Sequence, residues 1–212
     1  MKPNFNRIYL GIRNKPIFYR FTLGVSILLS IGFIPTGFVK LLGLRFTSIT
    51  PEESMVGAFF DLLYRSNYYW RFIGLTQIIA GITVLFKKTL ALGAILFVAI
   101  SLNILFITIS YGFGNTVYVA IGLVLASLWL CYWEWNKLSV LFLGQNYLPT
   151  KINELKLSSR FESIVYILGF TSGLLFFSVL RGLVLPMILV YISVFLMIGT
   201  FITSIVLGIK FR

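Results

Sequence analysis

Four polar side chains interrupt the apolar segments of this chain where they could form a binding site. They are Lys40, Arg71, Gln77 and Asn103. Polar groups in a hydrocarbon layer are costly, so they usually face protein or a water-filled cavity. Two cations above two amides would suit a headgroup that accepts hydrogen bonds, such as a quinone carbonyl or a lipid phosphate. The pattern predicts a polar pocket that opens toward one membrane surface.

The two amides are expected at the same depth in the membrane. Gln77 follows the start of its apolar segment by about 9 residues, and Asn103 precedes the end of the next by about 8, so both lie about 12–13 Å below one surface. A hydrogen bond between them would contribute about 0.6–2 kcal/mol. In the alternative interpretation, Lys40 and Arg71 extend to lipid phosphates and the amides only join two helices. The sequence leaves both interpretations open.

Other site chemistry is excluded by residue types that the chain lacks. It contains no histidine and one cysteine, Cys131. Imidazole-based zinc or haem sites, an imidazole general base and a redox dithiol are therefore excluded. We predict no catalytic residue, no metal ligand and no intrinsic cofactor. The net charge is +12, and the basic residues lie in short segments between the apolar ones. This distribution is typical of membrane proteins and argues against nucleic-acid binding.

The elements that would position the pocket are six long apolar segments. The chain is 58% hydrophobic and 11% charged, whereas soluble domains hold about 45–50% apolar and about 25% charged residues. A membrane-spanning helix needs roughly 20 apolar residues. We therefore predict an all-α, polytopic membrane protein whose helices cover Phe21–Gly43, Tyr69–Phe86, Thr89–Tyr111, Thr116–Trp135, Ser163–Leu180 and Leu183–Ile209.

Charge and aromatic residues indicate an orientation. Most of the 18 basic residues lie in segments 1–20, 87–88, 137–160 and 210–212, which predicts that both termini are cytoplasmic. Residues at the segment ends are expected to anchor the protein at the membrane surfaces. These anchors are Arg45, Trp70, Trp133 and Trp135.

The connecting segments predict further organisation. Thr50-Pro51-Glu52-Glu53 has the pattern of a capping box, so we expect an outer interfacial helix over about 51–65, with Asp61 and Arg65 paired. A cytoplasmic loop is expected over 139–160. A second capping box, Ser159-Arg160-Phe161-Glu162, would start the fifth segment, where Gly169 and Gly173 suit close helix packing. We thus divide the chain into a basic terminus (1–20), a four-helix unit (21–138), the loop and a two-helix unit (161–212).

The four-helix unit resembles the DoxX-like family of small bacterial membrane proteins. The resemblance rests on Gly37-Phe38-Val39-Lys40-Leu41, on the Gln77-containing segment Phe72–Ile82, and on Leu92-Gly93-Ala94 after a short basic turn. It covers about 21–138 and implies a protein of the bacterial cytoplasmic membrane that associates with redox complexes. Some members are linked to quinone reduction with a partner subunit, and many have no assigned activity. Many members carry glutamate where this chain has Gln77, which puts proton handling by this chain in doubt.

Three functions remain open from the sequence. The first is an accessory or scaffold subunit of a membrane complex, without catalytic activity of its own, that contacts lipids and a protein partner or a second copy. The second is a quinone-interacting subunit of a membrane oxidoreductase. The third is a transporter of a small molecule or lipid, which the lack of a visible inverted repeat disfavours.

Overall fold

The computed structural model describes residues 3–144 and 160–180, together with scattered positions between 188 and 203. This part of the chain is helical and contains no β-strand. Its helices are α1 (Pro3–Arg13), α2 (Pro16–Leu41), α3 (Met55–Arg65), α4 (Tyr68–Thr83), α5 (Leu90–Ser110), α6 (Thr116–Trp133), α7 (Trp135–Leu143) and α8 (Arg160–Leu180). The predicted all-α fold is confirmed. Most of the predicted sixth segment and most of the predicted loop lie outside the described residues.

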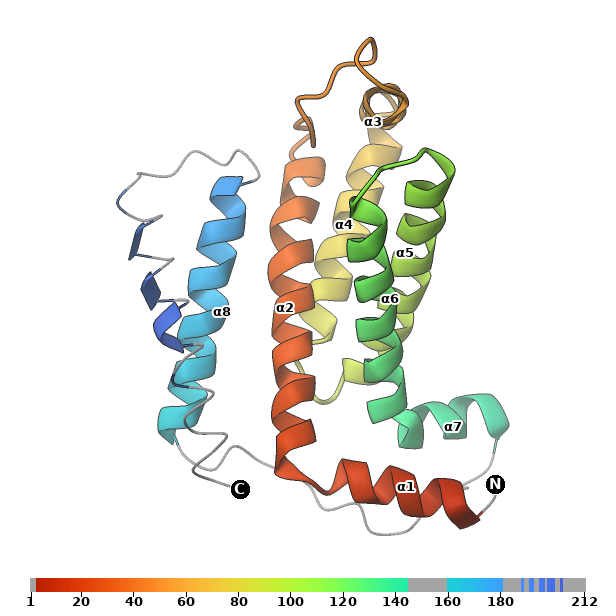
Figure 1. Cartoon of the computed structure of the whole chain (residues 1–212), viewed down its shortest axis with the longest axis vertical. Coiled ribbons are helices and arrows are strands. Elements are labelled where there is room, and N and C mark those ends of the chain that lie inside the picture. Colours follow the sequence, from red (N-terminus) through yellow and green to blue (C-terminus); the bar gives the residue numbers. More distant parts are fainter. Residues whose placement is uncertain are drawn as a thin grey trace.

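The helices α2, α4, α5 and α6 form an antiparallel bundle (Figure 1). In it, α2 packs against α4 and α6, and α5 packs against the same two helices. By length and apolar composition, α2, α5 and α6 can cross a membrane. The second segment forms α4, which has 16 residues, and the apolar part of α8 covers Ser163–Phe177; both are shorter than the roughly 20 residues of a full crossing. Within the described residues, the structure thus supports three of the expected spans, those of α2, α5 and α6.

An apolar core fills the bundle between its middle and the end at which α1 lies. Its closest ring contact joins Phe33 of α2 and Phe97 of α5, whose centroids lie 4.6 Å apart. The core is made of Leu29, Phe33, Ala80, Val84, Leu90, Ala94, Phe97, Leu130 and Trp133. Toward the other end, polar side chains replace apolar ones in the interior, among them Thr36, Lys40, Gln77 and Thr108.

Glycines allow the tightest helix contacts. A Cβ on Gly37 of α2 would lie 2.7 Å from the carbonyl oxygen of Gly74 on α4, so a side chain at this crossing would force the helices apart. On α8, a Cβ at Gly173 would overlap the Ile31 side chain of α2, and one at Gly169 would lie 3.1 Å from Oγ1 of Thr200. The prediction that Gly169 and Gly173 permit close packing is confirmed.

The helix α3 crosses the end of the bundle opposite α1 (Figure 1). It begins at Met55, later than predicted, because Ser54 is the N-cap and its hydroxyl accepts from the Gly57 amide. The expected capping box forms only in part: the Glu53 carboxylate accepts from the Thr50 amide, but residues 51–53 make a turn. A Cβ on Gly57 would overlap the Thr50 carbonyl, so this turn folds back directly onto the first turn of α3.

Two helices at the α1 end of the bundle were not predicted. The segment expected to be only a basic terminus forms α1, and α7 occupies 135–143, partly in place of the expected loop. Both lie across the bundle end (Figure 1). Because each is short and leaves apolar side chains exposed, both resemble interfacial helices more than spanning ones.

Candidate functional site

Lys40 lies in the last turn of α2 and is almost completely buried, with 5% of its surface exposed. Its ammonium donates to the Thr36 carbonyl at 3.3 Å. Two aromatic rings cover it: the Phe46 centroid is 4.2 Å away and that of Trp70 is 5.2 Å away. A desolvated cation over aromatic faces gains about 2 kcal/mol or more. The lysine expected to line an open pocket is therefore enclosed by the protein.

The Trp70 side chain closes the bundle over Lys40. Its indole Nε1 donates to the Leu44 carbonyl at 3.0 Å, which fixes the segment after α2 against the start of α4. Only 1% of the Trp70 surface is exposed. Trp70 is therefore packed within the protein interior and held by Leu44; its role as an interfacial anchor stays a prediction.

Gln77 faces the bundle interior from α4, with 8% of its surface exposed. Its Oε1 has no hydrogen-bond partner in the described part of the chain. Gln77 follows Gly74 by three residues, as Lys40 follows Gly37, but the two helices are antiparallel. A Cβ on Gly74 would lie 2.9 Å from the Lys40 Cβ, so Lys40 is level with Gly74. Gln77 lies three residues further along α4, about 4.5 Å away along the bundle axis.

The structure does not bring Arg71 and Asn103 into the interior. Both are exposed. The Arg71 Nε donates to the Asn67 Oδ1 at 3.1 Å, and its guanidinium lies beside Gly43, where the chain leaves α2. Of the four residues predicted to form one pocket, Lys40 and Gln77 point inward at different depths, whereas Arg71 and Asn103 point outward.

The hydrogen bond expected between Gln77 and Asn103 is not among the contacts of the described residues. Instead, a hydrogen bond between Ser101 Oγ and Ser127 Oγ, at 3.1 Å, joins α5 to α6. Asn103 lies two residues after Ser101, about 200° further round the helix, and so faces away. Thr108, one heptad after Ser101, is buried and was missed. Its hydroxyl donates to its own helix, at the Leu105 carbonyl.

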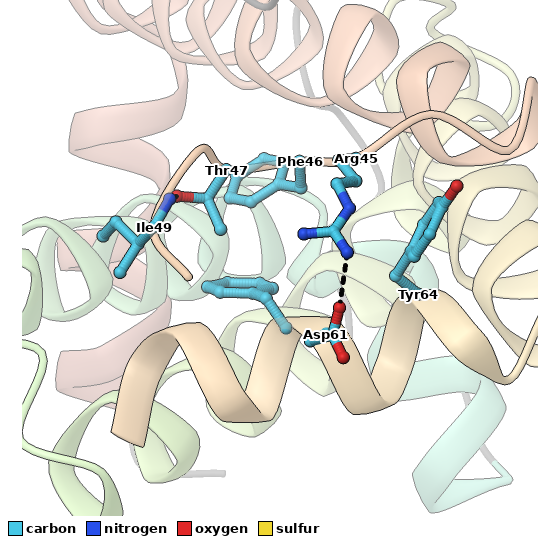
Figure 2. Close-up of a pocket in the computed structure, with 7 residues that line it drawn as sticks. Arg45, Phe46, Thr47, Ile49, Asp61 and Tyr64 are labelled. Carbon is cyan, nitrogen blue, oxygen red and sulfur yellow. Dashed lines mark hydrogen bonds and ion pairs between the residues drawn. The ribbon is translucent and has the colours of Figure 1, made fainter. Parts of the chain in front are cut away.

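A partly open pocket with a cavity volume of about 10 Å³ lies between α3 and the segment that precedes it (Figure 2). In it the Arg45 guanidinium points at the Asp61 carboxylate, with Nη2 and Oδ1 2.7 Å apart. Asp61 also binds Arg65, as predicted. The pocket is smaller than typical small-molecule sites of about 300–1,000 Å³. Its lining residues are Arg45, Phe46, Thr47, Ile49, Phe60, Asp61 and Tyr64.

Arg45 lines this pocket as the ion-pair partner of Asp61, while its role as a membrane anchor stays a prediction. About half of its side chain is exposed, whereas Asp61 is buried. The arginine therefore neutralises a buried carboxylate while its own surface remains in contact with the surroundings. This pair ties the segment after α2 to α3.

At the other end, Glu134 joins α1 to the junction of α6 and α7. Its Oε2 lies 2.5 Å from Lys137 Nζ, the ion pair expected from the sequence. Its Oε1 lies 3.5 Å from Arg13 Nη2, a partner that was missed because α1 was not predicted. The Arg13 guanidinium also lies 4.0 Å from the centroid of the Trp133 ring.

Tyr9 strengthens this junction. Its hydroxyl donates to the Trp133 carbonyl at 3.1 Å, and burial raises the pKa of the Tyr9 hydroxyl above its ordinary value. Trp133 is buried, and Arg13 of α1 covers its ring; its role as an interfacial anchor stays a prediction. Trp135 remains half-buried and contacts the Phe5 ring at 6.3 Å.

The described residues contain no group of three or more histidine, cysteine, aspartate or glutamate side chains that could hold a metal ion. Of the four residues predicted to form the pocket, two could bind a small ligand from the interior: Lys40, which is enclosed by rings, and Gln77, whose carbonyl oxygen lacks a donor. The arrangement can bind or position a polar group. It contains no pair of nucleophile and base in the part of the chain that the structure describes.

Comparison with known proteins gives one informative relative. No family model matches the chain, and no solved structure matches it. The chain is 32% identical over 111 residues to the "Uncharacterized protein YwoB" of Bacillus subtilis (strain 168). The match covers 48% of this chain and 71% of that protein. At this identity and coverage, the chain belongs to the same family as the uncharacterized Bacillus subtilis protein YwoB.

Proposed function

We propose that this protein is a non-catalytic accessory or scaffold subunit of a complex in the bacterial cytoplasmic membrane. In this proposal α2, α4, α5 and α6 form a DoxX-like unit, and α1 and α7 lie on the cytoplasmic side. The concentration of basic residues in segments 1–20, 87–88 and 137–160 supports this orientation. The relative from Bacillus subtilis supports a bacterial source.

The use of charge inside the fold supports a structural role. Asp61 and Glu134, the two buried carboxylates in the part of the chain that the structure describes, are each paired with two cations of the same chain. Lys40 is covered by rings of the same chain. A catalytic or transport site needs ionisable groups that can meet a substrate, whereas here they brace the two ends of the bundle.

The observation that carries the proposal is a continuous apolar face on α4. Its exposed side chains recur every three or four residues, so they form one stripe along the helix. They are Tyr69, Phe72, Leu75, Ile79 and Ile82. In the bundle α4 is covered by α2 and α5, and this third face is left to lipid or to a helix of another protein. We propose that a partner subunit packs on it.

Copurification from the native membrane tests this proposal. The double variant Phe72→Ala/Ile79→Ala removes two large side chains from the centre of the stripe. The matched control is Val119→Ala/Leu125→Ala, which truncates two exposed side chains on α6. We expect the α4 variant, but not the α6 variant, to lose the copurifying subunit. Equal retention of the subunit in both variants would refute the α4 interface.

A second candidate function is a quinone-interacting subunit. It is favoured by Gln77, whose buried Oε1 has no donor in the described structure, and by the buried ammonium of Lys40. The amide and ammonium N–H groups would donate to quinone carbonyls, and Oε1 would accept from a hydroquinone. This function predicts quinone in a mild-detergent preparation and its loss in Gln77→Ala or Lys40→Ala. A preparation without quinone, with both variants functioning normally in cells, would rule this candidate out.

A further inference from the structure

A second polar site lies at the opposite end of the bundle, where α1 meets the junction of α6 and α7. We name this site the α1–α7 corner and define it by Arg13, Asn14, Glu134, Trp135 and Asn136. These side chains gather there because the Arg13–Glu134 ion pair fixes α1 against the junction. The Tyr9–Trp133 hydrogen bond holds the same two elements together one turn earlier in α1.

The α1–α7 corner lies among side chains suited to the boundary between headgroups and acyl chains. Both helices lie across the bundle end (Figure 1). They expose the large apolar side chains Ile8, Leu141 and Phe142, and the same end carries the exposed basic residues Arg7, Lys15, Lys88 and Lys137. Short helices with this division of apolar and basic residues lie in the interfacial layer of a membrane. The corner is therefore at the depth of lipid phosphates.

The charges in the corner do not cancel. Glu134 has 3% of its surface exposed and is the single carboxylate between Arg13 and Lys137. Lys137 additionally donates to the Lys87 carbonyl at 2.8 Å, which holds its ammonium at this place. One negative charge against two positive charges leaves a positive excess, so an anion would be stabilised beside Arg13.

Five buried polar atoms in the corner have no hydrogen-bond partner in the described structure, and one of them, Glu134 Oε2, forms the ion pair with Lys137. The four atoms without any partner are Arg13 Nε, Asn14 Oδ1, Trp135 Nε1 and Asn136 Oδ1. Leaving a buried polar atom unsatisfied costs about 1–3 kcal/mol, and native proteins normally satisfy such atoms with protein, water or a ligand. The four atoms belong to two pairs of consecutive residues, 13–14 and 135–136, which lie next to the buried ion pair of Glu134. This arrangement indicates that the corner holds a polar molecule.

The types of these atoms define that molecule. Arg13 Nε and Trp135 Nε1 can only donate, which suits phosphate oxygens. Each asparagine amide has one acceptor and two donors, so either orientation of the amide can bind a headgroup hydroxyl or phosphate. Free phosphate would use the donors but would leave the apolar side chains around the corner without a partner. We propose that the α1–α7 corner binds an anionic phospholipid through its phosphodiester headgroup, with the acyl chains alongside the exposed apolar residues of α1 and α7.

Native mass spectrometry of the full chain in mild detergent tests this site, with phosphatidylglycerol and phosphatidylcholine of identical acyl chains as probes. We expect phosphatidylglycerol to be retained preferentially. Arg13→Gln removes a charge-assisted contact and should weaken retention about tenfold. Because Arg13 also braces Glu134, the second variant is Trp135→Phe, which keeps an aromatic ring and removes only the N–H; it should weaken retention severalfold without lowering the unfolding temperature.

Two controls separate a built site from general attraction. Lys88→Gln removes one exposed charge at the same end of the bundle, and it should change retention by less than twofold. Inorganic phosphate and glycerol 1-phosphate, added at millimolar concentration, should not displace the lipid. Equal retention of both lipids, unchanged retention in Trp135→Phe, an equal loss in Lys88→Gln and Arg13→Gln, or displacement by free phosphate would each overturn the proposal.

Discussion

Gly37 of α2 and Gly74 of α4 face each other at the closest approach of these two helices. A Cβ on Gly37 would lie 2.7 Å from the Gly74 carbonyl oxygen, and a Cβ on Gly74 would lie 2.5 Å from the Gly37 carbonyl oxygen. Neither neighbour can move aside, because both are backbone atoms. This contact sets the spacing of α2 and α4 and thereby the positions of Lys40 and Gln77, each three residues beyond its glycine.

Substitution of Gly37 tests the closeness of this crossing. We expect Gly37→Ala to lower the free energy of unfolding by about 1–3 kcal/mol, because the added methyl group forces the backbones apart. The control is Gly24→Ala in the same helix, where a Cβ meets nothing within 4 Å; it should be neutral or stabilising by up to about 1 kcal/mol. The measurement is unfolding in mixed micelles of increasing SDS content. Equal changes in the free energy of unfolding for the two substitutions would contradict the close approach of α2 and α4 at Gly37.

Replacement of Gln77 separates an unsatisfied side chain from a structural hydrogen bond. Since Gln77 Oε1 has no partner in the described residues, Gln77→Leu should leave the free energy of unfolding unchanged or raise it by about 1 kcal/mol. Ser101→Ala removes the hydrogen bond to Ser127 and should lower it by about 1 kcal/mol. Unfolding in mixed micelles measures both. If Gln77→Leu lowered the free energy of unfolding as much as Ser101→Ala does, Gln77 would already be bound by a partner.

The contrast between Gln77 and Asn103 shows what could be predicted from the sequence. The depth of both amides follows from the lengths of the apolar segments, and the antiparallel pairing of α4 and α5 follows from their short connection. The direction in which Asn103 points cannot be predicted from the sequence, because α5 is apolar on every side and has no preferred face. Burial in the bundle selects Ser101 and Thr108 for the interior, and Asn103 is then directed outward.

The anchor residues show a second limit of sequence-based prediction. Trp70 and Trp133 lie at segment ends, where tryptophan commonly contacts headgroups, but segments 42–54 and 3–13 fold over their rings. Covering of this kind is a tertiary effect without a local signal. The ion pairs of Asp61 with Arg65 and of Glu134 with Lys137 could be predicted because their spacing along one helix or turn suffices.

Tyr9 makes the α1 junction sensitive to alkaline pH. Its pKa is raised by burial, so the folded protein keeps a proton that the unfolded chain releases near pH 10. The stability contributed by Tyr9 is therefore complete below about pH 10 and is lost as the pH rises through the raised pKa. At pH 8, Tyr9→Phe should cost about 0.5–1.5 kcal/mol through the lost hydrogen bond to Trp133.

Thermal unfolding between pH 8 and 11 measures this dependence. The difference in unfolding temperature between the unsubstituted protein and Tyr9→Phe should shrink above pH 10. Tyr118→Phe, at an exposed position on α6, should unfold like the unsubstituted protein at every pH. A difference for Tyr9→Phe that stays constant or grows above pH 10 would contradict the buried, neutral hydroxyl.

The proposed orientation can be tested because Cys131 is the single cysteine of the chain. In a Cys131→Ser background, Glu52→Cys and Lys88→Cys each place one thiol at an exposed position, at opposite ends of the bundle. In intact bacterial cells, a membrane-impermeant maleimide should label position 52 at once and position 88 only after permeabilisation. The opposite pattern would reverse the assignment of α1 and α7 to the cytoplasmic side.

The central claim, that this protein is a structural subunit of a larger membrane complex, is tested most directly by native mass spectrometry of the complex extracted from its own membrane. One spectrum reports both bound polypeptides and bound small molecules. We predict an assembly that contains this chain, a second polypeptide and phospholipid, without quinone. A chain that appears in every charge state only as a monomer, or that retains a quinone whose mass is absent in Gln77→Ala, would contradict the claim.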